Sequence, residues 1–383
     1  MSGWRLLQDD GAGAADGPAL DEALLHGFHR EGDGTSQPVV RLYTYRSHCA
    51  LIGRHQSLAA EVDTDACDEL GIDVGRRLTG GGAIIMGSDQ LGIAVAMRAP
   101  VQRSPRDVLR QCAEGVIAAL ERLGLEARFR GKNDLEVGGR KIAGLGLHLD
   151  QHGGLLFHAS VLADLDVEVL VRALRIPGAK LSAHGIGRVQ DRVTTVSREL
   201  RTSMTGPDLR PFLLAGFVQA LGPDVQDGEP TVRERVVAAD LTERYASPDW
   251  LDQRGGRDAV HSSALVRTPE GLLRIYVGVQ GSALSSVMVT GDMSFLPDSV
   301  NRAEALLRWR PAEPDLIADT LREVLEPEVF GVGPDPIAAG VWAAAREAME
   351  RSGSLPVRLS GSCYFPDPIT SQPSPDLAAT ETA

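Results

Sequence analysis

A run of two arginines, a threonine and three glycines has the residue types of an anion-binding loop. Residues 76–83 read Arg-Arg-Leu-Thr-Gly-Gly-Gly-Ala. Consecutive glycines allow a backbone to approach a ligand closely and to point successive N–H groups at an anion. Arg76 and Arg77 can add bidentate contacts to a phosphate or carboxylate, and Thr79 can add one hydroxyl. The alternative interpretation is a glycine-rich hairpin loop with surface arginines.

A second basic segment follows at residues 128–144, which read Arg-Phe-Arg-Gly-Lys-Asn-Asp-Leu-Glu-Val-Gly-Gly-Arg-Lys-Ile-Ala-Gly. Its first fourteen residues hold five basic and two acidic side chains, although the whole chain carries a net charge of −13. This local excess predicts an anion site rather than a basic surface over the whole molecule. The Gly-Gly pair predicts a turn that places Lys141 at the start of a strand. Asn133 and Asp134 offer oxygen ligands of the kind that Mg²⁺ accepts beside nucleotide phosphates. A charged, exposed hairpin is the alternative.

The lysines are rare and lie in one part of the chain. Only three of the 39 basic residues are lysines, namely Lys132, Lys141 and Lys180, and the other 36 are arginines. Because arginine supplies nearly every positive charge, this cluster favours a contact that needs a compact ammonium on a flexible stem. Chance clustering under codon bias is the alternative.

A strand with two polar side chains on one face is predicted directly after the lysine segment. Residues 154–162 read Gly-Leu-Leu-Phe-His-Ala-Ser-Val-Leu. Alternation along a strand places His158 and Ser160 on one face and the apolar residues between them on the other. A lone histidine is more often structural than catalytic, so its position after the lysines is what makes His158 a candidate. His148 and His152 have metal-ligand spacing for a helix, but they fall in a predicted hairpin and are interpreted as loop histidines.

The elements that must position these residues are short strands in hairpins, with few helices between them. Glycine-rich turns separate the apolar runs, and Ser104-Pro105 begins an amphipathic helix with an N-cap and a proline at N1. This pattern predicts an α+β sheet and not a parallel βαβ fold. Strands are expected at 39–45, 50–53, 83–86, 91–97, 135–137, 142–149 and 155–162, and helices at 59–71 and 104–123.

Length and composition predict two domains. The chain has 383 residues, of which 43% are hydrophobic and 24% are charged, as in a folded, soluble protein. Residues 366–383 are rich in Ser, Thr, Pro and Ala, which predicts a disordered tail. A second region begins near residue 245, with a hairpin expected at 272–289 and helices at 300–308, 314–325 and 336–351.

Charge and cysteine usage disfavour several classes of function. A net charge of −13 disfavours a general nucleic-acid surface, because binding to phosphates needs a basic face. No window holds 18 consecutive apolar residues, so no membrane span is expected. The N-terminus has no secretory signal pattern. Four cysteines without a C-x-x-C pair fit a reducing cytoplasm, which is the predicted location.

Taken in order, these segments resemble the lipoate–protein ligase A family. The family pattern has S/T-G-G-G-A after an arginine-rich approach, then G-R-N-D-L, then G-R-K-[IV]-[SA]-G and G-x-x-x-H-x-[ST]-L strands, and later K-L-x-x-x-G-I. The similarity covers about residues 4–200, and residues 244–325 resemble the family's C-terminal accessory domain. The chain matches these motifs with residues 76–83, 131–135, 139–144, 154–162 and 180–186.

The resemblance implies an α+β fold with two unequal parts. The catalytic domain would be like those of class II synthetases and biotin ligases, with a mixed, largely antiparallel sheet, and the C-terminal accessory domain would be small and α+β. A hinge near residues 235–250 could let the accessory domain reorient. The expected boundaries are 1–235 for the catalytic domain, 236–250 for a linker, 251–365 for the accessory domain and 366–383 for the disordered tail.

The resemblance also implies two half-reactions at one site. Lipoate or octanoate reacts with ATP and Mg²⁺ to give an acyl-adenylate and pyrophosphate. The acyl group then passes to a lysine of a lipoyl-carrier domain of a 2-oxoacid dehydrogenase or of the glycine cleavage system. By resemblance Lys141 is the catalytic residue, in contact with the carboxylate and α-phosphate, and Asp134 is the candidate Mg²⁺ ligand. The residues expected to bind the acyl group and ATP are Arg76, Arg77, Thr79, Gly80, Gly81, Gly82, Ala83, Asn133, Asp134, His158, Ser160 and Lys180.

The chain departs from the family pattern after the glycine run. The family usually carries His-Asp and then Gly-Asn there, whereas residues 86–90 read Met-Gly-Ser-Asp-Gln. Lys132 also replaces an arginine, and Thr195 replaces an asparagine. These changes fall on the substrate side, so acyl specificity is left open.

Three alternatives therefore stand beside the ligase. The first is an ATP-independent octanoyl or lipoyl transferase, which needs an activated cysteine thiolate near the lysine strand. No cysteine lies between Cys112 and Cys363, and Cys49 and Cys67 are better explained as buried small hydrophobes. The second is a non-catalytic family member that binds an acyl-adenylate or a partner domain. The third is a structural α+β protein with basic hairpins.

Overall fold

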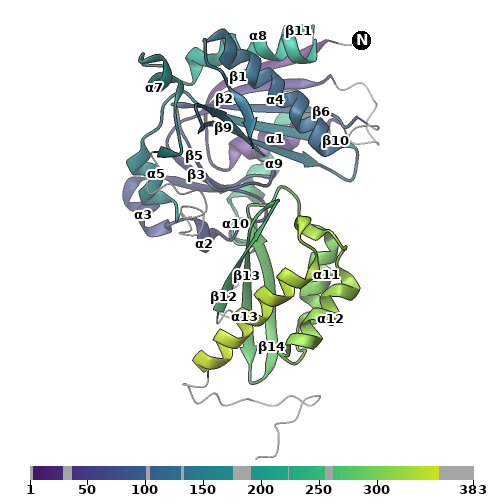
Figure 1. Ribbon diagram of the computed structural model, residues 1–383. Helices are drawn as coiled ribbons and strands as arrows, with labels where there is room; N and C mark the ends of the chain where they lie inside the picture. The colour runs from purple at the N-terminus through teal and green to yellow at the C-terminus, as the bar shows by residue number, and fades with distance from the viewer. Residues whose placement is uncertain are drawn as a thin grey trace, which may run out of the picture.

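The chain forms two α+β units, and Figure 1 shows the larger, N-terminal unit above the smaller, C-terminal one. The computed structural model describes residues 3–28, 37–100, 104–130, 133–175, 191–222, 224–254 and 262–352. Lys132, Lys180 and the tail at 366–383 lie outside the described residues. No helix within the described ranges is long and apolar enough to cross a membrane.

Eight strands form the central sheet of the larger unit. β1 runs parallel to β2 and β11, and all other neighbouring pairs are antiparallel. The sheet is therefore mixed and largely antiparallel, as predicted. Its order is β11 (Val225–Asp227), β1 (Trp4–Ala12), β2 (Val39–Tyr45), β6 (Gln90–Arg98), β10 (Gly154–Leu162), β9 (Arg140–Leu149), β8 (Asp134–Val137) and β7 (Arg128–Arg130).

Helices of the larger unit cover this sheet and connect its strands. They are α1 (Asp16–His26), α2 (Leu58–Glu61), α3 (Thr64–Leu70), α4 (Pro105–Arg122), α5 (Val167–Ala173), α7 (Val196–Leu200), the 3₁₀ turn η2 (Pro207–Leu209), α8 (Arg210–Leu221), α9 (Val232–Ala246) and α10 (Pro248–Leu251).

The two faces of the central sheet differ in polarity. On one face α4 and α8 pack against buried apolar side chains such as Ile93 and Phe157. The prediction of α4 is confirmed, including its N-cap, because Ser104 Oγ accepts a hydrogen bond from the Asp107 N–H at 3.2 Å. Alternate residues of the same strands form the opposite face, which carries His158 and meets α1. We call this second surface the polar face.

A small second sheet lies over the polar face. Its strands are β4 (Asp73–Arg76), β3 (Cys49–Ile52) and β5 (Ile84–Met86), in that order. Residues 46–48 carry the chain from β2 into this sheet, and residues 87–89 carry it from β5 back to β6. The Tyr45 N–H donates to the Gly87 carbonyl at 3.2 Å, so the two crossings lie together.

The helix predicted at 59–71 is interrupted and forms α2 and α3. Val62 and Asp63 have extended backbone between them. Asp63 accepts a hydrogen bond from the Ala66 N–H at 3.2 Å and so caps α3. The predicted C-cap is confirmed, because Gly71 adopts the left-handed conformation with φ of 63°.

Helices α9 and α10 join the two units. Together they include most of the predicted linker at 236–250, and α9 packs along α1 through Tyr245 and Leu241. A helix therefore runs across the predicted boundary at residue 235, and the boundaries themselves stay predictions.

The smaller unit is an antiparallel three-stranded sheet with helices packed on it. Its apolar core, which includes Ile275, Val289 and Val341, is separate from that of the larger unit. The predicted hairpin and three helices are present, whereas the first strand is not predicted. The elements are β12 (Ser262–Thr268), β13 (Gly271–Gln280), β14 (Ala283–Gly291), α11 (Asp298–Leu307), α12 (Pro314–Val324), the 3₁₀ turn η4 (Val329–Gly331) and α13 (Pro334–Ser352).

Candidate active site

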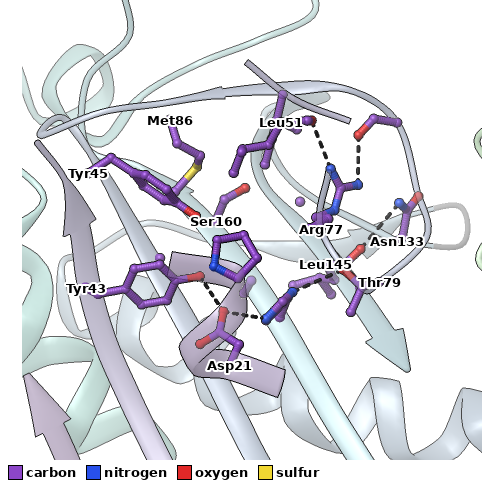
Figure 2. A pocket seen from close by; sticks show the side chains of 18 of the residues that line it. Asp21, Tyr43, Tyr45, Leu51, Arg77, Thr79, Met86, Asn133, Leu145 and Ser160 are labelled. Carbon is purple, nitrogen blue, oxygen red and sulfur yellow. Dashed lines mark hydrogen bonds and ion pairs between the residues drawn. The ribbon is translucent and has the colours of Figure 1, made fainter. Parts of the chain in front are cut away.

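A cavity lies between the polar face and residues 79–82, which we call the glycine loop (Figure 2). The space of this first cavity, counted together with the part that is open to solvent, is about 570 Å³. Lys141 and Gly82 both line it, so the two main sequence motifs meet on one cavity. The other lining residues discussed below are Asp21, Tyr43, Tyr45, Arg77, Thr79, Met86, Asn133, Gly144, His158 and Ser160.

Glycines of β6 and β9 leave room for the first cavity. A Cβ on Gly92 would lie 2.9 Å from a tyrosine ring of β2, and a Cβ on Gly146 would lie 3.0 Å from Thr79 Oγ1. A Cβ on Gly144 would lie 3.2 Å from Lys141 Nζ. Side chains at these positions would crowd the residues that line the cavity. The absence of a side chain at these glycines therefore keeps the lining residues in place.

An Asp–His–Thr chain forms part of the cavity wall, and Figure 2 labels its two ends, Asp21 and Thr79. The distance from His158 Nε2 to Asp21 Oδ2 is 2.9 Å, and that from His158 Nδ1 to Thr79 Oγ1 is 3.1 Å. We assign the hydrogen to Nε2 because the carboxylate can only accept, so Nδ1 accepts from the Thr79 hydroxyl. The order matches that of hydrolytic triads. Thr79 is nevertheless fully buried, so we assign this chain a positioning role.

Asp21 is held ionised although it is buried. Burial alone would raise its pKa, but the charge of Arg41 and the hydrogen bond from His158 reverse this and lower it. Arg41 Nη1 donates to Asp21 Oδ1 at 2.7 Å, and the Tyr43 hydroxyl donates to Asp21 Oδ2 at 3.0 Å. Asp21 and Tyr43 are absent from the predicted site. Two adjacent acidic residues, Asp21 and Glu22, in the middle of a mostly apolar helix were the available signal, because a buried carboxylate needs partners.

Lys141 is fixed by backbone contacts on both edges of its strand. It pairs with Glu136 on β8. On the other side its N–H donates to the Arg192 carbonyl and its carbonyl accepts from the Thr194 N–H, both at 2.8 Å. Lys141 Nζ lies 2.7 Å from Asp134 Oδ1, and each of these side chains is about one-third exposed. The strand therefore fixes the ammonium at the edge of the cavity.

A second cavity begins where the first one ends. Its space, counted in the same way, is about 850 Å³, and its walls are mostly apolar and come from β5, β10 and α5. Lys141, Gly144, Ser160 and Ile84 line both cavities. Lys141 and Ser160 therefore lie at the junction of a smaller, polar-ended space and a larger, apolar one.

A comparison with known protein families finds a match in the larger unit. The family described as "Lipoyl protein ligase A/B catalytic domain" matches residues 14–218, which is more than half of the chain. The chain belongs to this family.

Known relatives include both ligases and transferases. The lipoate-protein ligase LplJ of Bacillus subtilis is 29% identical over 287 residues, covering 73% of this chain and 84% of LplJ. The octanoyltransferase LipM of Symbiobacterium thermophilum is 30% identical over 273 residues, covering 64% and 97%. A solved structure of a bipartite lipoate protein ligase from Thermoplasma acidophilum is similar with a TM-score of 0.58 and 27% identity, covering 65% and 96%. The predicted α+β, class II synthetase-like fold is confirmed.

In this lipoyl ligase family member, Arg77 binds the glycine loop itself. Its Nη2 donates to the carbonyls of Gly80 and Gly82, each at 2.8 Å, and its Nη1 donates to the Leu51 carbonyl at 3.1 Å. Burial lowers the pKa of Arg77 to about 10. The guanidinium lines the first cavity, but these donors shape the loop rather than point freely at a ligand.

Arg76 lines neither cavity of those described. Its guanidinium is fully buried and donates to five backbone carbonyls, without a carboxylate among the hydrogen-bond acceptors. Two of the five belong to α10, and the Trp250 Nε1–H donates back to the Arg76 carbonyl at 3.0 Å. The structure thus places Arg76 between β4 and α10.

The glycine loop also contacts the smaller unit. A Cβ on Gly80 would lie 2.4 Å from the Met293 carbonyl oxygen and 2.6 Å from that of Ser294. The Gly81 N–H donates to the Met293 carbonyl at 3.2 Å, and Gly81 has a φ of 94°. Gly80 is therefore required here for the close approach of the smaller unit, and the Gly81 N–H binds that unit instead of an anion.

The remaining predicted residues divide between the cavities. Asn133 lines the first cavity, and its amide donates to the Leu145 carbonyl at 3.4 Å. Ala83 lines the second cavity. His148 lies in β9 and not in a loop, whereas His152 lies in the turn after that strand. Among the described residues no group of three or more His, Cys, Asp or Glu could hold a metal ion.

The three described cysteines are buried and have no activated thiolate. Burial raises the pKa of Cys49 to about 12, that of Cys67 to about 11 and that of Cys112 to about 12. None of them lines either cavity. A thiolate nucleophile needs a lowered pKa and access to the substrate.

Proposed function

We propose that this chain is an ATP-dependent lipoate–protein ligase. It would convert lipoate or octanoate to an acyl-adenylate and transfer the acyl group to a lysine of a lipoyl-carrier domain. The observation that carries this proposal is the position of Lys141 at the junction of two cavities. An acyl-adenylate has two unlike halves joined by one anhydride, and this junction suits the anhydride.

The two cavities divide the ligand between them. The acyl chain would lie in the first cavity, along the glycine-lined floor, and the nucleotide would lie in the larger second cavity beside Ala83. This allocation puts the carboxylate and the α-phosphate next to Lys141, where negative charge concentrates during adenylation. A preorganised cation stabilises that charge without forming a bond to the substrate.

Each half-reaction then needs only positioned groups. In the first, a carboxylate oxygen attacks the α-phosphorus, the bond to the β-phosphate oxygen breaks, and pyrophosphate leaves. In the second, the neutral amine of the acceptor lysine attacks the acyl carbonyl, the carbonyl–oxygen bond to AMP breaks, and the nitrogen loses a proton. Lys141 would stabilise the phosphate oxygens in both steps.

The residues near Lys141 fit a Mg²⁺ ion that accompanies the nucleotide. Asp134 supplies one carboxylate, and Asn133 supplies an amide beside the first cavity. Mg²⁺ in nucleotide sites is commonly held by one or two carboxylates together with phosphate oxygens. When bound, it would screen the phosphate charge, and Asp134 would then exchange its contact with Lys141 for the ion.

An ATP-independent octanoyltransferase is the second candidate, favoured by the 30% identity to LipM. Such an enzyme would need a nucleophile for an acyl-thioester. The buried, high-pKa thiols of the described cysteines argue against it.

A cytoplasmic location, without nucleic acid or membrane as partner, completes the proposal and is supported by the free thiols and the acidic composition.

One experiment separates the two candidates. Purified protein is incubated with Mg²⁺, lipoate or fatty acids of varied length, and an apo lipoyl domain, with and without ATP, and products are read by intact mass and pyrophosphate release. A ligase acylates the domain only with ATP and releases pyrophosphate. Acylation from octanoyl-carrier thioester without ATP would support the transferase instead.

A further inference from the structure

The polar face continues past Lys141 to an edge strand. One transverse row of paired residues crosses five antiparallel strand pairings: Tyr43, Gly92, Ser160, Gly144, Asp134 and Arg130. Paired residues of adjacent strands share a face, so these side chains and glycine positions lie on the same surface.

Exposure rises steadily along this row. Tyr43 and Ser160 are buried, the Asp134 side chain is 33% exposed and that of Arg130 is 72% exposed. Lys141 lies beside the row at the point where it leaves the cavity. The solvent side of the reacting centre is therefore β8 and β7, and β7 is the edge of the sheet.

Arg128 and Arg130 occupy this edge and differ from the inner cations in how they are paired. Lys141 lies 2.7 Å from Asp134, and Arg140 lies 2.7 Å from Glu199, and all four side chains are at least two-thirds buried. By contrast, Arg128 and Arg130 are 80% and 72% exposed. Their nearest carboxylate oxygens lie 3.7 Å and 3.6 Å away, on Glu126 and Glu136.

The two edge arginines also stand out against the rest of the molecule. The chain has a net charge of −13, so two loosely paired guanidinium groups beside the site are not part of a general basic surface. Both lie on the polar face because they alternate along β7. Loose, exposed pairs of this kind contribute little to folding stability. Their charge is available to a partner.

We propose that Arg128 and Arg130 form the docking surface for the acceptor protein, a folded domain that carries carboxylates beside its target lysine. This inference rests on the proposed function and specifies how that function selects its protein substrate. Adjacent strands are about 4.8 Å apart, so β7 lies about 10 Å from the strand of Lys141, within the span of one small domain. A carboxylate-flanked lysine can then reach the junction of the cavities while its neighbours contact the arginines.

The test separates docking from activation. The variants are Arg128→Glu, Arg130→Glu and the double variant, with Arg106→Glu as the matched control, since Arg106 is exposed on α4 across the sheet. Acyl-adenylate formation is followed as hydroxamate produced with hydroxylamine, without acceptor. Transfer is followed by intact mass over a range of concentrations of an isolated lipoyl domain of a 2-oxoacid dehydrogenase E2 subunit.

We expect the double variant to raise the KM for the lipoyl domain by about tenfold, because like charges would then face each other. Its hydroxamate rate should stay within twofold of the parent, and Arg106→Glu should change neither. Added salt should raise the parent's KM toward that of the variant. A lipoyl domain whose flanking carboxylates are changed to lysines should reverse the ranking and favour the double variant.

Three results would overturn the inference. They are an unchanged KM for the double variant, an equal fall in the hydroxamate rate, which would assign the arginines to ATP, or an equal effect from Arg106→Glu. Failure of the proposed function is distinguishable, because the parent protein would then form no hydroxamate from ATP and any acid tested.

Discussion

Two basic segments contribute to the site, and they use the same charge in different ways. Before the glycine loop, Arg76 and Arg77 donate to backbone carbonyls of their own chain. On β7 to β9, Lys141 and the edge arginines lie beside carboxylates and remain at least partly exposed. The first segment builds the cavity wall, and the second supplies charge at its opening.

This difference shows what decides the role of a buried cation. A guanidinium has five N–H donors, and it becomes structural where carbonyl oxygens surround it. Arg76 is surrounded in this way by carbonyls of the turn that follows β3 and of α10. An ammonium at the end of a flexible chain, next to one carboxylate, can exchange that partner for a ligand.

The largest effect should come from Lys141. We expect Lys141→Arg to lower acyl-adenylate formation by about 1000-fold, nearly as much as Lys141→Ala, because the planar guanidinium cannot make the same compact contact at the junction. Hydroxamate production measures the rate, and the melting temperature should stay close to that of the parent. Near-full activity of the arginine variant would contradict the assignment of a specific ammonium contact.

The next effect should be on stability, at Arg76. Arg76→Met would remove five hydrogen bonds to backbone carbonyls, two of them buried and three part-buried, and should lower the free energy of unfolding by about 3 kcal/mol. Thermal unfolding followed by circular dichroism tests this, with Arg106→Met as the control for removing an exposed arginine. If Arg76→Met unfolds at the parent's temperature but loses ATP binding, then Arg76 is a ligand residue and the contrast between the segments fails.

Arg244 pairs with the carboxylate of Glu22, so the stability that this pair contributes should depend on pH, unlike that contributed by Arg76. Burial alone would raise the pKa of Glu22, but hydrogen bonds from His26, Tyr245 and Arg244 lower it to about 2. Because this folded pKa lies below the unfolded value of 4.5, the stabilisation is complete above pH 4.5 and disappears as the pH falls to about 2.

Replacement by glutamine tests this sign. Glu22→Gln should destabilise the protein by about 2 kcal/mol at pH 7, and the difference from the parent should shrink between pH 4.5 and 2. Urea unfolding at several pH values measures it. Arg76→Met should show no such convergence, since carbonyl acceptors do not titrate. A constant difference for Glu22→Gln would remove this distinction between the two arginine environments.

The smallest effect should follow from a methyl group at the cavity junction. In Gly144→Ala the new Cβ would lie 3.2 Å from Lys141 Nζ, so the ammonium must shift by a few tenths of an ångström. We expect kcat to fall about tenfold with an unchanged melting temperature. Gly139→Ala is unsuitable as a control because of its positive φ, whereas Ala143→Gly tests the same strand on its other face.

Sequence reasoning located the strands of the site but not the use of every charge in it. Alternation along residues 154–162 was enough to separate His158 and Ser160 from the core face, since one face of the strand is buried in apolar packing. Asp21 was missed because its partners, Arg41 and His158, come from distant strands. Spacing along a chain carries no information on such long-range pairing.

The glycine loop illustrates a second limit. Its glycines are predicted to approach a ligand, yet Gly80 accommodates Met293 and Ser294 of the smaller unit. A glycine in a sequence indicates that another group approaches the backbone closely, but it does not identify that group. Arg76 and Arg77 were assigned to a ligand for the same reason, because donors can be read from a sequence whereas their acceptors depend on the fold.

The paired crossings between the two sheets have a consequence for substrate size. Residues 46–48 and 87–89 connect the central sheet, on one side of the first cavity, to the small second sheet on the other side. The Tyr45 N–H donates to the Gly87 carbonyl and so links the two connections. Lengthening or shortening either connection would change the distance between the two sheets without changing any residue that lines the cavity. The Met-Gly-Ser-Asp-Gln segment at residues 86–90 contains one of these connections, and it begins at Met86, which lines the first cavity. Its effect on acyl choice would therefore come both from the distance between the two sheets and from direct contact through Met86.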